Sequence, residues 1–128
     1  MTTISLQSTD SASIRGREDR YMMVRVDPKA VIKSWRDSLF SFEWLHQDGS
    51  IRGLDDLPLH ERDKRLKVEK HLSSGQPLER PVLGIGVMDN VEIGAGRDIF
   101  LTLAAHGASE IEVHIPKSSA SEFKPFLR

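Results

Sequence analysis

The residues of this sequence best suited to chemistry form a glycine-rich turn with an arginine and an aspartate beside it. They are Gly94, Ala95, Gly96, Arg97 and Asp98. Residues 91–93 alternate like a half-buried strand, and an apolar pattern of helical spacing follows the turn. A glycine turn between a strand and a helix directs backbone N–H groups and the positive end of the helix dipole at one point. We therefore predict an anion-binding turn, with the guanidinium of Arg97 beside the anion.

Two common phosphate motifs do not fit this turn. It lacks the third glycine of a dinucleotide fingerprint, because Ile99 stands at that position, and no Gly-Lys-Ser/Thr follows as in a Walker A loop. A bare G-x-G is a weak signal. An alternative therefore stays open, in which the segment is only a tight turn and Arg97 pairs with a nearby acidic side chain.

Metal-assisted cleavage of a phosphate ester needs carboxylates close to the phosphates. Glu92 precedes the turn by two residues, and Asp98 stands at the start of the helix. We predict both as metal ligands for Mg²⁺, with Glu92 and Arg97 as the catalytic residues. The alternatives are that Glu92 is a solvent-facing strand residue and that Asp98 stabilises the N-terminus of the helix by its charge.

A cluster of basic residues is the candidate surface for DNA. It lies on a long helix expected over residues 58–74 and closed by Gly75. The predicted contact residues are Arg62, Arg65, Lys67 and Lys70. Because the net charge of the chain is −1 at pH 7, nucleic acid must be held by such a local patch. The alternative is an ordinary solvated helix face.

Composition narrows the class of protein. The 128 residues suit one domain with a core of its own. The chain has no cysteine, which excludes disulfides, thiolate metal sites and cysteine nucleophiles. No apolar run approaches the ~18 residues of a membrane span, and the first residues lack the apolar region of a signal peptide. We expect a cytoplasmic protein with no membrane span.

Periodicity predicts the elements that position these residues. Residues 1–20 are expected to be a flexible N-terminal tail, and residues 21–128 one α+β domain. Expected strands cover 21–26, 81–87, 91–93 and 111–115, and a short terminal helix covers 119–127. A helix is expected after Asp27 with Ile32, Trp35 and Leu39 on its buried face. The 58–74 helix is expected to bury Leu59, Leu66 and Leu72.

The order of these elements, with the runs GQPLERPVL, VEIGAGR and EIEVHI, resembles the ParB/sulfiredoxin superfamily. In that superfamily a G-x-x-R turn and a helix N-terminus hold nucleotide phosphates, and Gly94 and Arg97 match this turn. The resemblance implies a small mixed sheet with flanking helices. It also implies ATP or another nucleoside triphosphate as cofactor, bound with Mg²⁺ at residues 94–98. Ala95 stands where the sulfiredoxin cysteine would be, so reduction of sulfinylated thiols is excluded.

Within the superfamily, residues 81–107 together with the run SWRDSLFSFEWL look like the plasmid fertility-inhibition group. That likeness implies a plasmid-encoded protein that blocks transfer of conjugative DNA or T-DNA through a type IV secretion system, with ATPase and DNase activity. Its implied partners are DNA, bound without sequence specificity, and secretion-system or relaxosome components in the cytoplasm or at the inner face of the membrane. The alternative is a non-catalytic module that blocks a transfer protein by contact alone.

Overall fold

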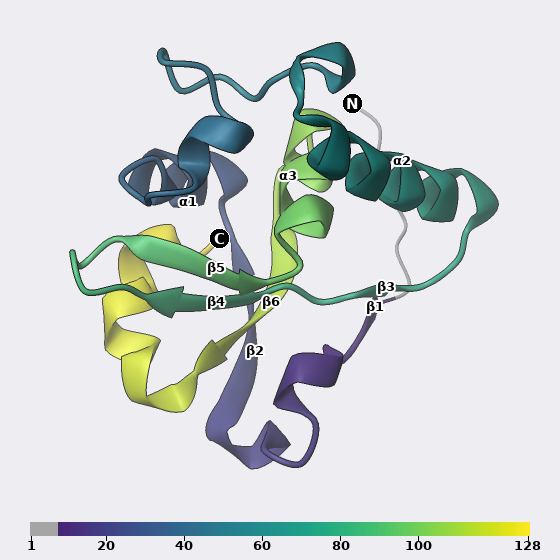
Figure 1. The fold of residues 1–128 in the computed structure, drawn as a ribbon. Coiled ribbons are helices and arrows are strands. Elements are labelled where there is room, and N and C mark those ends of the chain that lie inside the picture. The colour runs from purple at the N-terminus through teal and green to yellow at the C-terminus, as the bar shows by residue number, and fades with distance from the viewer. Residues whose placement is uncertain (1–7) are drawn as a thin grey trace.

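The computed structural model of the chain describes residues 8–128 and has a single α+β domain, as expected (Figure 1). Its main sheet has the strand order β2-β6-β4-β5, in which β6 and β4 are parallel and the other two pairs are antiparallel. These strands are β2 (Tyr21–Val26), β4 (Val82–Ile85), β5 (Val91–Ala95) and β6 (Ile111–Pro116). Two short strands, β1 (Ser8–Thr9) and β3 (Leu78–Glu79), pair in parallel beside it.

Three α-helices lie on the same side of β4 and β5 (Figure 1). They are α1 (Pro28–Trp35), α2 (Leu59–Ser74) and α3 (Arg97–Ala105). Short 3₁₀ helices lie between these elements: η1 (Ala12–Ile14), η2 (Glu18–Arg20), η3 (Ser41–Glu43) and η4 (Leu54–Asp56). A longer one, η5 (Lys117–Phe126), follows β6. None of the helices in residues 8–128 has the length and apolar character needed to cross a membrane.

The hairpin of β4 and β5, which leads into the predicted turn, was predicted from local sequence patterns. Asp89 adopts a positive φ of 61° between β4 and β5, as expected of a turn aspartate. The strand before it ends at Ile85, however, and Val87 is fully exposed instead of continuing the apolar face. Gly86 follows the strand where Glu92 approaches closely, since a Cβ there would lie 2.8 Å from Cγ of Glu92.

Helix α1 begins as predicted and ends early. The side chain of Asp27 accepts a hydrogen bond from the N–H of Lys29, which caps the first turn. The helix stops at Trp35, and Leu39, which was expected on its buried face, is exposed. The hydroxyl of Ser41 donates to the carbonyl of Arg36, so a local side-chain bond replaces the next helical turn.

Helix α2 has the predicted extent and a different buried face. Gly75 ends it in the left-handed conformation, with φ of 71°. Leu59 and Leu66 are exposed, and the buried side chains are Val68 and Glu61. The expected apolar face was therefore wrong for Leu59 and Leu66, whereas Leu72 packs against the core as predicted. In the first turn of α2 the buried side chain is the paired carboxylate of Glu61.

The described part of the expected tail is packed against the domain. β1 pairs with β3 through Ser8 and Leu78, and Ile14 is 1% exposed. The prediction of a tail reaching residue 20 is therefore corrected for residues 8–20, while residues 1–7 lie outside the described part. The predicted terminal helix is also present in a changed form, as the 3₁₀ helix η5, which buries Phe123.

Candidate functional site

The predicted turn joins the end of β5 to the start of α3. Gly96 adopts a φ of 75°, and a Cβ there would lie 3.0 Å from Cα of Pro81, so this position requires glycine. The first hydrogen bond of the helix runs from the N–H of Phe100 to the carbonyl of Gly96. No side chain caps the helix. The N–H groups at the start of the helix, before Phe100, therefore have no partner within the helix.

A pocket of about 370 Å³ opens at this helix start. All five residues predicted to bind the ligand, Gly94–Asp98, line it, as does Ile93. Helix α2 contributes Glu61, Lys64 and Lys67 to the lining. The pocket thus combines the uncapped start of a helix with three cationic side chains, Lys64, Lys67 and Arg97, against the carboxylates of Glu61 and Asp98. The cations outnumber the acids, and with the positive end of the helix dipole they favour an anion.

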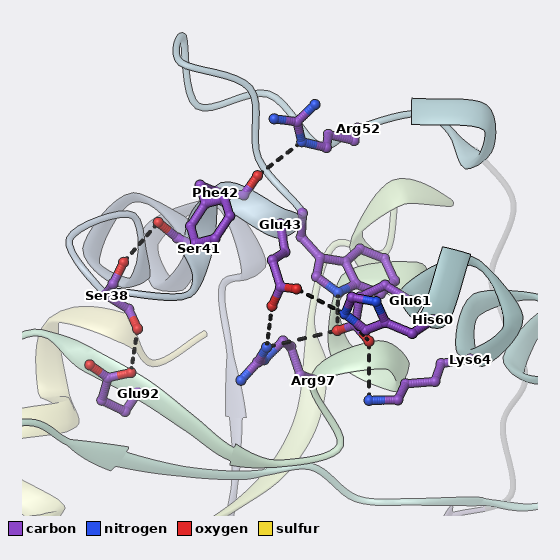
Figure 2. Close-up of polar contacts among 11 residues, drawn as sticks. Ser38, Ser41, Phe42, Glu43, Arg52, His60, Glu61, Lys64, Glu92 and Arg97 are labelled. Carbon is purple, nitrogen blue, oxygen red and sulfur yellow. Dashed lines mark hydrogen bonds and ion pairs between the residues drawn. The ribbon is translucent and has the colours of Figure 1, made fainter. Parts of the chain in front are cut away.

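Arg97 is held in place by carboxylates and aromatic rings. Its Nη1 lies 3.6 Å from Oε1 of Glu43 and 3.8 Å from Oε1 of Glu61 (Figure 2). Its guanidinium lies over the rings of Trp35 and Phe40, at 5.9 and 5.7 Å from their centroids. The alternative that Arg97 pairs with a nearby acidic side chain therefore holds, and Arg97 lines the pocket at the same time.

Glu61 is the most buried charged group of the site, with a side chain only 3% exposed. Its Oε1 accepts a hydrogen bond of 3.0 Å from the indole of Trp44, and its Oε2 lies 3.1 Å from Nζ of Lys64. Burial acts to raise the pKa of Glu61, but the contacts with Trp44 and Lys64 and the charge of Arg97 outweigh it and hold that pKa below its ordinary value. Glu61 is therefore ionised at neutral pH.

A second acid beside Arg97 was missed by sequence reasoning. Glu43, in η3, contacts Arg97 through Oε1, and its Oε2 lies 2.9 Å from Nε2 of His60. His60 and Glu61 were visible only as part of a charged helix, and Glu43 stood in an apolar stretch of ambiguous structure. No local pattern indicates that these residues meet near residue 97, because they converge only through packing.

The two predicted metal ligands are not brought together at the pocket. Asp98 lines it, whereas Glu92 does not. The carboxylate of Glu92 accepts a hydrogen bond of 2.7 Å from the hydroxyl of Ser38 and one of 2.9 Å from the amide of Asn90. Figure 2 shows Glu92 beside Ser38 and apart from Arg97. Because both oxygens of Glu92 are engaged, this geometry does not favour Glu92 as a ligand or catalyst.

The four predicted DNA-contact residues divide into two pairs. Arg62 donates to the carbonyls of Asp55 and Leu57, and Arg65 donates to the carbonyl of Arg52. These guanidinium groups anchor the loop before α2. The second pair is Lys67 and Lys70, whose side chains are exposed and make no hydrogen bond or ion pair within residues 8–128.

Comparison with protein-family models, curated proteins and solved structures finds no match for this chain. The likeness to the ParB/sulfiredoxin superfamily therefore rests on the short sequence runs around the turn and the neighbouring strands. The coarse α+β architecture agrees with it. What this chain can do chemically is determined by the site itself, which combines a pocket, two lysines and an anchored arginine.

Proposed function

We propose that this protein binds a phosphate-bearing ligand, with a nucleoside triphosphate as the first candidate, in the pocket at the start of α3. The observation that carries this proposal is the pocket lining, which brings the uncapped start of α3 together with Lys64 and Lys67 of α2. Phosphate groups are the common ligands that use both kinds of donor. In line with the superfamily resemblance, the biological role proposed is inhibition of plasmid DNA transfer through a type IV secretion system.

Titration of the purified protein with ATP, CTP and GTP, with and without Mg²⁺, tests the binding. Lys67→Ala removes a cation from the pocket wall, and a hydrogen bond to a charged group contributes about 1.5–3 kcal/mol. We therefore expect affinity to fall by roughly tenfold or more. Lys70→Ala is the matched control, because Lys70 lies on the same helix and does not line the pocket. Equal affinities in both variants would overturn the proposal.

Metal-dependent hydrolysis of nucleotide and DNA is the second part of the proposal, carried over from the resemblance. Asp98 is the predicted carboxylate that lines the pocket, so Asp98→Asn is expected to reduce hydrolysis more than Glu92→Gln does. The assay measures hydrolysis of ATP and of plasmid DNA with Mg²⁺ and with EDTA. Activity that survives the chelator contradicts a metal-dependent mechanism.

The alternative of a non-catalytic interaction module has its own supporting observation. Leu39, Phe40 and Phe42 are exposed by 85%, 54% and 64% on the segment that follows α1. Neighbouring exposed apolar side chains are typical of protein-binding surfaces. In a transfer assay with producing donor cells, this alternative predicts that Phe42→Ser abolishes inhibition and Lys67→Ala does not. The nucleotide-dependent function predicts the reverse.

A further inference from the structure

Three side chains with metal-binding atoms converge next to the phosphate pocket. They are Glu43 of η3 and His60 and Glu61 from the first turn of α2, and one ligand atom of each lies within 4.8 Å of the others (Figure 2). Oε2 of Glu43 and Nε2 of His60 are 2.9 Å apart, and Nε2 of His60 and Oε2 of Glu61 are 4.0 Å apart. Bond lengths of about 2.0–2.2 Å to a central ion are compatible with such separations after small side-chain rotations.

The oxygens of the two glutamates have separate roles. Both Oε1 atoms face Arg97, and that of Glu61 also accepts the Trp44 indole bond. The Oε2 atoms are on the His60 side. Oε2 of Glu61 is buried, and its partner in the described structure is the ammonium of Lys64, 3.1 Å away. An ionised, buried oxygen needs a cation beside it, and here an exposed lysine supplies that cation.

We propose that Oε2 of Glu43, Nε2 of His60 and Oε2 of Glu61 bind a zinc ion, with solvent as the fourth ligand. Imidazole nitrogen is a good ligand for zinc and a poor one for Mg²⁺, which prefers oxygen. Three protein ligands with one open position is an arrangement that zinc accepts in its tetrahedral geometry. His60 is 64% exposed, so the ion has a path from solvent. This site needs no nucleotide, although Glu61 and Lys64 also line the pocket of the proposed function.

Lys64 is the competitor for this site. Its ammonium lies 3.1 Å from Oε2 of Glu61, and its side chain is 59% exposed. A lysine on a flexible side chain can move into solvent when a divalent ion arrives. Arg97 cannot do so as easily, because the two glutamates and the aromatic rings beside it hold its guanidinium at the Oε1 atoms. Zinc and Lys64 therefore exclude each other at Oε2 of Glu61. Removing the lysine is expected to strengthen zinc binding, a result that a merely structural ion-pair network does not predict.

The test uses the full chain without an affinity tag, freed of metal with EDTA and then titrated with zinc against a chromophoric chelator. Wild type is expected to bind one zinc ion. Loss of a residue that only supports a metal ligand weakens metal binding by roughly 10–100-fold. His60→Ala and Glu43→Gln remove a ligand itself, so each is expected to weaken zinc binding by at least that much. Lys64→Ala is expected to strengthen it. Cobalt in place of zinc is expected to give the visible absorption of a tetrahedral site in wild type and to lose it in His60→Ala.

Matched controls separate this site from adventitious binding. His106 also pairs with a single glutamate, Glu69, at a surface position on another helix end. His106→Ala and Lys70→Ala are therefore expected to leave zinc affinity unchanged. Because His60 is mostly exposed, its variant should remain folded, and circular dichroism checks this. No bound zinc in wild type, equal loss in His60→Ala and His106→Ala, or no gain in Lys64→Ala overturns the proposal.

Discussion

The indole Nε1 of Trp44 donates a hydrogen bond to Oε1 of Glu61 across 3.0 Å, and neither side chain is more than 3% exposed. This bond holds a carboxylate inside the domain, where it faces Arg97 at the start of α3. The position of Glu61 in the site therefore depends on the core, because its carboxylate is hydrogen-bonded to a core tryptophan.

The first prediction concerns that bond. Glu61→Ala leaves the Trp44 indole without an acceptor, and a buried unsatisfied donor costs about 1–3 kcal/mol. Glu61→Gln keeps an oxygen in the same place and is expected to lose less. Urea unfolding followed by tryptophan fluorescence measures both free energies of unfolding. Equal losses in the two variants would show that the hydrogen bond is not the important contact.

The second prediction compares Gly96, in the turn before α3, with Gly84 of β4. Gly96→Ala forces a side chain into a left-handed conformation, which costs about 1–2 kcal/mol, and places a Cβ against the backbone of Pro81. Gly84→Ala is the control, because a Cβ there meets nothing within 4 Å. We expect clear destabilisation for Gly96→Ala and a change near zero or slightly stabilising for Gly84→Ala. Thermal unfolding of both variants provides the comparison.

The third prediction tests two differences between the sequence pattern and the structure together. Ile14 was placed in a tail and is buried, whereas Leu39 was placed on a buried helix face and is exposed. Ile14→Ala is expected to cost about 2–5 kcal/mol, and Leu39→Ala to stay within about 0.5 kcal/mol of wild type. The reverse order in urea unfolding would favour the placement that the sequence pattern predicts.

The fourth prediction concerns pH. Burial lowers the pKa of His114, helped by Arg80, while the charge of Asp10 opposes the shift. The folded pKa therefore lies below the ordinary value of 6.5, and between the two the unfolded chain binds more protons. Stability from this group is complete above pH 6.5 and falls as the pH drops through the folded pKa. His114→Gln is expected to flatten this dependence.

Unfolding free energies measured on both sides of pH 6.5 check the His114 prediction. The quantity to compare is the difference between wild type and His114→Gln, because other titrating groups contribute equally to both. A difference that stays constant across the window, or grows in favour of wild type at low pH, contradicts the assignment.

The fifth prediction concerns the binding of DNA that the superfamily resemblance implies. Lys67 and Lys70 are exposed cations of α2, so replacing both with alanine is expected to flatten the log–log salt dependence of DNA binding by about two units, at roughly 0.9 per duplex phosphate. Arg62 and Arg65 hold backbone carbonyls. Their double replacement is therefore expected to lower stability as well. A slope that is unchanged in the lysine variant would move the DNA surface away from α2.

Local chemistry explains which elements were predictable. The end of α2 at Gly75 and the hairpin turn at Asp89 were predictable because each needs a residue with positive φ. Glycine and aspartate adopt that conformation more readily than most residue types. The turn at 94–98 was found for the same reason. The surroundings of Arg97 were not predictable, since Glu43 and Glu61 reach it only when η3 and α2 pack beside α3. The contact of Glu92 with Ser38, away from the pocket, was not predictable either, because Ser38 lies 54 residues away in the chain.

The pairing of β2 has a consequence for how the chain folds during synthesis. Within the main sheet β2 pairs with β6, and Val26 also forms a bridge with Leu127. The backbone groups of β2, near the start of the chain, therefore have their sheet partners only once residues 111–127 are present. Contacts of such long sequence separation slow folding. The main sheet can therefore be completed only after nearly all of the described chain has been synthesised.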